Sequence, residues 1–220
     1  MATRAATVRA IEAAGVVAVL RLADSRAAAE IASALKQGGV TIIEVTMTVP
    51  NAVALIAELS QSMDGVIIGA GTVINAKMAD DVITAGARFV VSPVLRPEVI
   101  DACRARDVAV VPGCFSPTEI LTGWELGADI VKVFPSTALG PGYCKDLRGP
   151  LPQVKLMPTG GVTRENAGDW IRAGAVAVGV GTALVDPKAV AAGRFDLVVD
   201  EARAFVEVVR HARGGVGVWR

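Results

Sequence analysis

The chain has 220 residues, of which 52% are hydrophobic, and its 22 basic residues balance its 22 acidic residues. This composition suits one large domain or two small ones with a sizeable core, and it includes no basic stripe for nucleic acid or anionic lipid. No apolar run approaches the roughly 18 residues of a membrane span, and the N-terminal segment lacks the continuous apolar core of a signal peptide, so we expect a cytoplasmic protein.

Histidine and cysteine restrict the chemistry that the chain can perform. His211 is the single histidine, whereas catalytic zinc sites typically use two or three, so we expect no metal site and no Ser-His-Asp or Cys-His arrangement. Cys103, Cys114 and Cys144 are widely spaced and odd in number, which predicts three reduced thiols. Catalysis must therefore depend on Lys, Glu, Arg, Thr and backbone amides.

Short runs rich in β-branched residues alternate along the chain with Ala-rich segments of helical period. After a helix predicted over about residues 3 to 14, eight predicted strands lie within residues 15–21, 41–47, 65–72, 87–93, 108–114, 128–136, 154–161 and 175–185. The repeat of roughly 21 to 26 residues is typical of a strand, a loop and a helix. Candidate capping residues of the helices are Asp24, Asn51, Asn75 and Ser116.

Eight such units favour an α/β fold, a (β/α)8 TIM barrel, with an extra N-terminal helix that could cap its bottom. The alternative is a doubly wound open sheet, which usually has fewer strands and a GxGxxG motif after the first one. Here the first strand is followed by "LADSRAA", which contains no glycine. Because no linker-like stretch divides the chain, we expect a single barrel domain over residues 1–213 and a flexible tail over residues 214–220.

A barrel places its functional residues at the C-terminal ends of the strands, and Lys132 is the one lysine well inside a predicted strand near that end. An ammonium group is costly to bury. Lys132 therefore either belongs to a buried ion pair or is an amine with a lowered pKa that attacks a carbonyl group. Glu44, in the second strand, is either its ion-pair partner or a general acid/base.

Glycine-containing loops follow the seventh and eighth predicted strands, in "PTGGV" (158–162) and "VGVGTALV" (178–185). Barrels often bind phosphate between these two loops, where glycines expose backbone N–H groups. A single glycine pair is usually only a tight turn, but two at adjacent strand ends indicate an anion site. Its candidate residues are Gly160, Gly161, Gly181 and Thr182.

Two further polar residues end predicted strands. Thr72, in "GAGT", could bond a carboxylate or a hydroxyl group, or it could simply cap the following helix. Arg21 ends the first strand, where it could bind a substrate anion or lie in a solvated loop.

The motifs "EVT", "GAGT", "SP", "VPGC", "KVFPS" and "MPTGGV" occur in this order over about residues 8 to 190. This ordered set resembles the 2-keto-3-deoxy-6-phosphogluconate (KDPG)/4-hydroxy-2-oxoglutarate (KHG) aldolase family. The resemblance implies a class I, Schiff-base aldolase on a (β/α)8 barrel, generally a homotrimer. It implies reversible cleavage of a 2-keto-4-hydroxy acid, usually phosphorylated, to pyruvate and an aldehyde, without a metal or an organic cofactor.

The resemblance also assigns roles to residues of this sequence. Lys132 would form the Schiff base, and Glu44 would take the proton of the C4 hydroxyl as the C3–C4 bond breaks. Thr72 and Thr159 would hold the pyruvyl carboxylate and neighbouring oxygens, and Pro93 would line the pocket. The phosphate would lie against Gly160, Gly161, Gly181 and Thr182.

The chain departs from the family pattern at Thr48, where KDPG-type members commonly carry an arginine that binds the substrate carboxylate. A threonine cannot make a bidentate charged contact. Either Arg21 supplies the cation, as in the related 2-keto-3-deoxy-6-phosphogalactonate (KDPGal) aldolases, or the preferred substrate differs. The segment "STALGPGY" (136–143) also resembles that branch. The predicted substrate is KDPG, KHG or both, with KDPGal as the alternative.

Two other classes of function compete with the aldolase. A non-catalytic barrel that binds a phosphorylated metabolite, with Lys132 and Glu44 as a structural pair, would explain the glycine loops but not a neutralisable lysine beside an acid. An isomerase or epimerase of this shape usually carries paired aspartates or histidines at strand ends, which this chain lacks. We therefore favour the aldolase.

Overall fold

The computed structural model describes residues 3–23 and 25–214. The candidate cap Asp24 and residues 215–220 of the predicted tail lie outside the described residues. Gly214, predicted to begin that tail, is instead the last residue of the C-terminal helix.

The strands of the described residues are short and run parallel to their neighbours in two sheets. The first sheet has the order β5-β4-β3-β2-β1-β9, and its members are β1 (Val16–Leu20), β2 (Ile42–Thr46), β3 (Ile67–Gly71), β4 (Phe89–Val91), β5 (Ala109–Val111) and β9 (Val178–Val180). The second has the order β6-β7-β8, formed by β6 (Gly113–Cys114), β7 (Val131–Val133) and β8 (Leu156–Pro158). Each of the eight predicted segments contains strand, which confirms the predicted periodicity.

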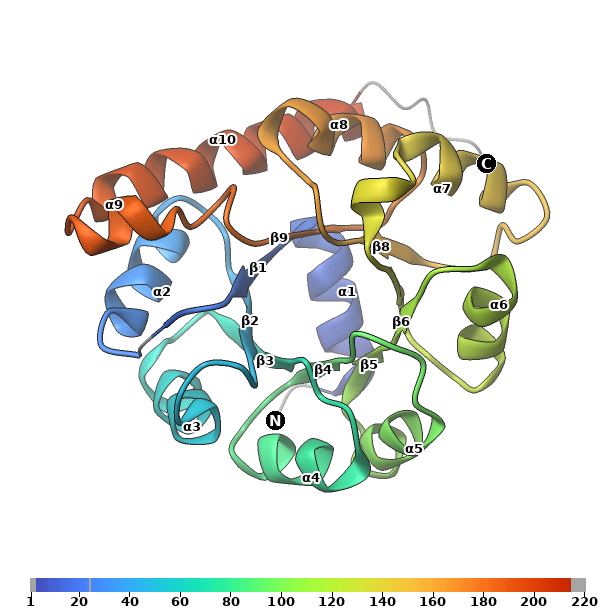
Figure 1. Cartoon of the computed structure of the whole chain (residues 1–220), viewed down its shortest axis with the longest axis horizontal. Coiled ribbons are helices and arrows are strands. Elements are labelled where there is room, and N and C mark those ends of the chain that lie inside the picture. Colours follow the sequence, from blue (N-terminus) through green and yellow to red (C-terminus); the bar gives the residue numbers. More distant parts are fainter. Residues whose placement is uncertain (1–2, 24, 215–220) are drawn as a thin grey trace.

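The two sheets adjoin at both ends. Only Pro112 separates β5 from β6, and Thr159, which follows β8, forms a parallel bridge to Gly179 of β9. Figure 1 shows the strands around a common centre, with the labelled helices other than α1 on the outside. The prediction of an α/β fold built on a curled parallel sheet is confirmed.

Helices alternate with the strands. They are α1 (Arg4–Ala14), α2 (Ala28–Gln37), α3 (Ala52–Ser62), α4 (Ala76–Thr84), α5 (Pro97–Ala105), α6 (Pro117–Glu125), the 3-10 helix η1 (Ser136–Ala138), α7 (Pro141–Arg148), α8 (Arg164–Arg172), α9 (Pro187–Ala191) and α10 (Phe195–Gly214). Two predicted caps are confirmed: Asn75 accepts a hydrogen bond from the Met78 N–H, and Ser116 forms a capping box with Glu119. Asn51 precedes α3 but makes no capping hydrogen bond with its side chain.

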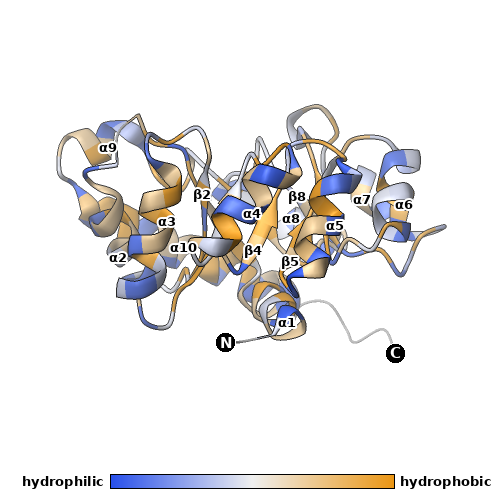
Figure 2. Ribbon diagram, turned by 90° about the horizontal axis from the view of Figure 1, so that it is seen from below, coloured by the Kyte–Doolittle hydropathy of each residue, from blue (hydrophilic) through white to orange (hydrophobic). Residues whose placement is uncertain are grey.

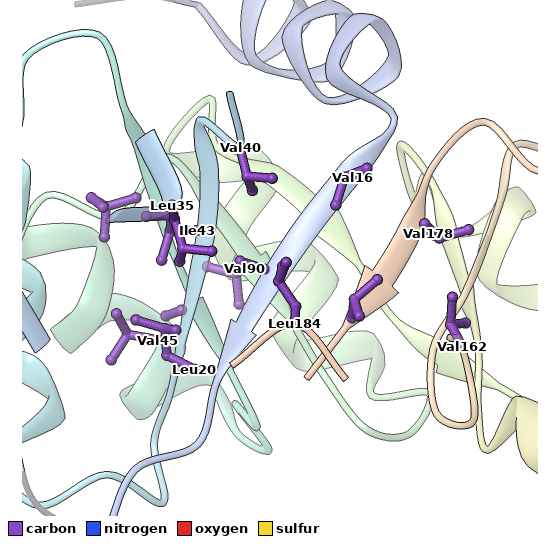
Figure 3. Close-up of a cluster of buried hydrophobic side chains, with 14 of the residues drawn as sticks. Val16, Leu20, Leu35, Val40, Ile43, Val45, Val90, Val162, Val178 and Leu184 are labelled. Carbon is purple, nitrogen blue, oxygen red and sulfur yellow. The ribbon is translucent and has the colours of Figure 1, made fainter. Parts of the chain in front are cut away.

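Alternation along the strands separates an outer apolar layer from an inner one. Residues 16, 18 and 20 of β1 belong to the outer cluster, which packs against the helices, whereas Val17 belongs to the inner cluster. Figure 3 shows part of the outer cluster, including Val16, Leu20 and Ile43. Because side chains alternate with a period of two, Glu44 lies on the inner face with Ile42.

Helix α1 covers the end of the sheets at which the strands begin. Val8 and Ile11 of α1 are buried in the inner cluster, and Figures 1 and 2 show the helix across the centre, on one side of the strands. Arg4 bonds the Asp129 carboxylate with its Nε at 2.8 Å, and Arg213 of α10 donates to the Val176 carbonyl at 2.9 Å and to the last turn of α1. The opposite end, where the strands terminate, is therefore the end available for a site.

Candidate active site

Lys132 of β7 and Glu44 of β2 are buried polar residues on the inner faces of their strands. Their exposed fractions are 5% and 1%. The Lys132 Nζ lies 4.6 Å from the centroid of the Phe134 ring, a distance at which the ring face attracts an ammonium group. Gly71 of β3 leaves the space that the Glu44 carboxyl group occupies, since a Cβ there would overlap Glu44 Oε1.

Burial shifts the pKa values of these two groups in opposite directions. Desolvation raises the pKa of Glu44, against the opposing effect of the positive charges of Lys132 and Arg21. Desolvation lowers the pKa of Lys132; the Glu44 charge opposes this shift, and the Arg21 charge adds to it. The lysine is thus more readily neutral and the carboxyl more readily protonated than either would be in water.

Lys132 and Glu44 act on each other through their charges without forming a direct salt bridge. In the part of the chain that the structure describes, no salt bridge joins the two residues. Glu44 Oε2 is buried without any hydrogen-bond partner. A buried acceptor left without a protein partner is uncommon in native proteins, and a catalytic role is one of the explanations for it.

Arg21 directly follows β1 and is exposed, yet its charge acts on both Lys132 and Glu44. The structure therefore brings together three of the residues that the sequence proposed separately. Arg21 also lines a pocket between α2 and α9, together with Leu22 and Val185. The strand-end loop that carries Arg21 is thus hollowed on one side.

Thr48 occupies the position at which KDPG-type members of the resembled family commonly carry an arginine. Its Oγ1 lies 2.7 Å from Thr46 Oγ1, and the Thr46 hydroxyl donates to the Leu20 carbonyl at 3.0 Å. These contacts join the ends of β1 and β2 immediately before Arg21. Sequence reasoning missed Thr46, although a threonine between the strand and its loop is visible in "EVT".

Thr159 lies at the end of β8 with an exposed fraction of 7%, and its Oγ1 is buried without a partner. Gly179 of β9 makes room for it, because a Cβ at Gly179 would overlap Thr159 Oγ1. Among the described residues, the buried side-chain polar atoms without a hydrogen-bond partner include Glu44 Oε2 and Thr159 Oγ1. Both residues were predicted to contact substrate.

One of the two glycine loops contains two residues with left-handed backbone conformations. Gly160 and Gly161 have φ angles of 90° and 71°, in the region that glycine adopts without steric cost. A Cβ at Gly161 would lie 2.9 Å from Thr137 Oγ1, so a larger residue would crowd this turn. Gly181 and Thr182 follow β9 directly, and Thr182 is exposed.

Thr72 and Pro93 follow β3 and β4. Thr72 has a φ of 62°, a left-handed conformation that costs a non-glycine residue on the order of 1–3 kcal/mol and that occurs at functional sites as well as in turns. Thr72 does not cap the following helix, because Asn75 does so. The Pro93 carbonyl lies against Gly113, where a Cβ would overlap it.

The described residues also bear on metal binding, membrane insertion and thiol chemistry. Residues 3–23 and 25–214 contain no group of three His, Cys, Asp or Glu side chains that could hold a metal ion. Within the same ranges, no helix combines the length and the apolar character needed to cross a membrane. Cys103, Cys114 and Cys144 are free and buried, and desolvation raises the pKa of each thiol to about 12.

Comparison with known proteins gives close matches over most of the chain. Residues 8–200 match the family described as "Aldolase: KDPG and KHG aldolase". A relative from Pseudoalteromonas atlantica, named 2-dehydro-3-deoxy-phosphogluconate aldolase, is 34% identical over 192 residues, which cover 87% of this chain and 89% of the relative. A relative from Escherichia coli, named 2-dehydro-3-deoxy-6-phosphogalactonate aldolase, is 37% identical over 150 residues, which cover 68% of this chain and 71% of the relative.

A solved structure gives the same result. The crystal structure of a KDPG aldolase from Legionella pneumophila, with pyruvate captured as a covalent carbinolamine intermediate, has a TM-score of 0.84 and 32% identity; the match covers 90% of this chain and 97% of that one. These matches define the protein as an aldolase, a carbon–carbon lyase of the class I, pyruvate-forming type. More narrowly, the chain belongs to the KDPG and KHG aldolase family, as its ordered motifs predicted.

The opposing effects of Glu44 and Arg21 on Lys132 predict the pH dependence of lysine reactivity. Only the neutral amine reacts with acetic anhydride, so labelling of Lys132, followed by peptide mass mapping over a pH series, reports its titration. In the wild type the midpoint should lie below that of free Nα-acetyl-lysine in the same tube, because burial lowers the pKa of Lys132. Glu44→Gln should move the midpoint to lower pH, since it removes a charge that raises this pKa, and Arg21→Gln should move it to higher pH. Shifts in the same direction for both variants would contradict the arrangement.

Proposed function

We propose that this aldolase reversibly cleaves KDPG, KHG or both to pyruvate and an aldehyde, which is glyceraldehyde 3-phosphate or glyoxylate respectively. The observation that carries the proposal is the pair of buried, unbridged groups Lys132 and Glu44 on the inner face of the sheet. The relatives named for KDPG and for KDPGal are of similar identity to this chain. KDPGal is therefore the alternative substrate.

The proposal includes the architecture that holds the site. The two sheets form one closed (β/α)8 barrel in which β5 and β6 are a single strand interrupted at Pro112, and α1 covers its bottom. The Thr159–Gly179 bridge between β8 and β9 supports closure, and proline interrupts the ladder because it has no N–H to donate. Residues 1–213 would constitute one domain.

Lys132 is the proposed nucleophile. Its neutral amine attacks the C2 ketone of the substrate, and loss of water leaves a protonated imine at C2. Glu44, directly or through water, takes the proton of the C4 hydroxyl as the C3–C4 bond breaks and the aldehyde leaves. The electron pair of that bond moves toward the imine nitrogen and gives an enamine. Protonation at C3 and hydrolysis then release pyruvate and restore the amine of Lys132.

This chemistry requires neither a metal nor an organic cofactor, because the protonated imine itself accepts the electron pair. The raised pKa of Glu44 suits a group that must both take and return a proton. The three free cysteines suit a reducing compartment. We therefore expect a cytoplasmic enzyme.

The remaining residues of the site would bind the ends of the substrate. Thr72 and Thr159 would hold the pyruvyl carboxylate and neighbouring oxygens, and Pro93 would line this part of the pocket. The unpartnered Thr159 Oγ1 supports this role. The N–H groups of the two glycine loops would bind the substrate phosphate, with the Thr182 hydroxyl beside them. The loop residues are Gly160, Gly161 and Gly181.

Reduction of the protein with borohydride in the presence of pyruvate tests the nucleophile. Peptide mass mapping should find a pyruvate-derived adduct on Lys132, and Lys132→Ala should lose both the adduct and the cleavage activity. Lys155→Ala is the control, because Lys155 pairs with Glu12 and is 39% exposed; it should retain both. A wild-type protein without an adduct on Lys132 would contradict the aldolase mechanism and favour the binding-barrel alternative.

Arg21 is the proposed cation for the substrate carboxylate, because Thr48 lacks a charge and engages Thr46. A hydrogen bond to a charged group contributes about 1.5–3 kcal/mol, so Arg21→Ala should raise the KM by roughly 10- to 100-fold. Arg96→Ala, at a surface residue paired with Glu98, should leave the KM unchanged. Steady-state kinetics with KDPG, KHG and KDPGal would also rank the three substrates by kcat/KM. An unchanged KM in Arg21→Ala would exclude this role.

A homotrimer completes the proposal. Three exposed apolar side chains lie in the loops after β3, β4 and β6, which are neighbouring strand ends: Ile74 (46%), Val94 (50%) and Phe115 (43%). Exposed apolar residues that lie together are typical of an interface, and neighbouring strand ends would bring these three onto one face. Light scattering should give three times the chain mass, and Val94→Asp should dissociate the trimer. Leu197→Asp, at an exposed apolar residue of α10 (41%), is the control and should not. A monomeric wild type would contradict this part of the proposal.

A further inference from the structure

Ser136 lies in the turn that follows β7, and it contacts the two strand ends that carry Lys132 and Thr159. We infer that Ser136 is a positioning residue: its hydroxyl holds the Thr159 backbone, and therefore the Thr159 hydroxyl, in register with the Lys132 amine. This inference rests on the proposed function. It adds a residue to which neither the motifs nor the comparisons assign a role.

The Ser136 hydroxyl makes two hydrogen bonds, one as a donor and one as an acceptor. It donates to the Val133 carbonyl at 2.7 Å and accepts from the Thr159 N–H at 3.0 Å. The Ser136 N–H in turn donates to the Thr159 carbonyl at 3.0 Å. The Thr159 N–H is shared, because it also donates to the Val133 carbonyl at 3.0 Å, so the Ser136 hydroxyl adds a side-chain partner to an existing backbone bond. Ser136 is 1% exposed, so water cannot take the place of this added partner if the hydroxyl is removed.

These bonds lie just where the regular sheet ends. The pairing of β7 with β8 stops at Val133 opposite Pro158, and the next residue of β8 is Thr159. The bond from the Thr159 N–H to the Val133 carbonyl continues the pairing by one residue, and the Ser136 hydroxyl and N–H add two further contacts to the Thr159 backbone. On its other side, Thr159 bridges to Gly179 of β9. Thr159 is thus held between two neighbours, and only one of them uses a side chain.

The same turn also positions Phe134, whose ring contacts the Lys132 amine. Phe134, whose ring lies 4.6 Å from Lys132 Nζ, is two residues before Ser136, and its N–H donates to the Cys114 carbonyl at 3.0 Å. Ser136 therefore fixes the far end of the segment that begins at Lys132. A displacement of about 1 Å in such a segment can lower a rate by about 100-fold.

The competing interpretation is that Ser136 merely closes a turn, as serines often do through a hydrogen bond to a nearby carbonyl. The bond to Val133 fits that interpretation. The bond from Thr159 does not, because Thr159 belongs to another strand, 23 residues away. If Ser136 acts through Thr159, the effects of changing the two residues must be coupled.

A double-mutant cycle tests this coupling with pyruvate itself as the probe. The rate of inactivation by borohydride is measured against pyruvate concentration for the wild type, Ser136→Ala, Thr159→Val and the double variant. Thr159 would bind the pyruvyl carboxylate before and after attack alike, so its loss should raise the half-saturating concentration more than it lowers the maximal rate. Ser136→Ala should raise that concentration by about 10-fold in the wild-type background and by less than about twofold in the Thr159→Val background.

Thr7→Val is the matched control, because Thr7 is also 1% exposed and its hydroxyl donates to a backbone carbonyl, but it lies in α1 at the other end of the strands. It should leave the saturation curve unchanged. Circular dichroism and a melting curve check the fold of every variant. If Ser136→Ala does not fold, Ser136→Cys, which keeps a weak donor, takes its place in the cycle.

The outcomes separate this inference from the proposed function. An equal rise in both backgrounds, or no rise in either, would overturn the positioning role while the Lys132 adduct still forms. A fall in the maximal rate with an unchanged half-saturating concentration would also overturn it. A wild type that forms no adduct would remove the proposed function itself, and the positioning role with it.

Discussion

The structure depends on one constraint: an amine and a carboxyl group are kept out of water without being allowed to neutralise each other in a salt bridge. Lys132 and Glu44 are 5% and 1% exposed, and each has a pKa shifted mainly by desolvation. Transfer of such charges out of water is costly. The apolar inner cluster and α1 create this environment from below, and Gly71 leaves the space in which the carboxyl group fits.

The strand period then explains why so few residues suffice to build the site. In β2 and β7, the neighbours of Glu44 and Lys132 point outward into the helical layer, and the charged side chains point inward. The parallel register puts Glu44 beside Gly69 and Lys132 beside Gly113. The space beside these two glycines is filled by the Phe89 ring and by the Pro93 carbonyl respectively, whereas the space beside Gly71 is filled by the Glu44 carboxyl group. In the proposed mechanism the substrate lies between Lys132 and Glu44.

The sequence alone located the residues whose chemical character conflicts with that of their neighbours in the chain. Lys132 and Glu44 were visible because a charge inside an apolar strand is costly and requires an explanation. Ser136 and Thr46 were not, because a serine or threonine at the end of a strand is typical of any turn, and only the partner across the sheet shows its role. The prediction that Asn51 caps its helix was wrong because of the local backbone conformation. The Asn51 backbone is left-handed, with a φ of 56°, whereas an N-cap residue normally has extended backbone angles.

The position of Arg21 links the electrostatics of the site to its specificity. A cation near both groups favours the neutral form of Lys132 and the ionised form of Glu44, which are the states that the proposed attack and proton removal require. The Arg21 side chain lies just after the end of β1 and is exposed, so it is accessible to the carboxylate of an incoming substrate. Thr48 cannot perform either task, because its hydroxyl is uncharged and engages Thr46. In this chain, therefore, one arginine at the end of β1 would both tune the nucleophile and bind the substrate, and a change at Arg21 should alter the pH dependence and the affinity together.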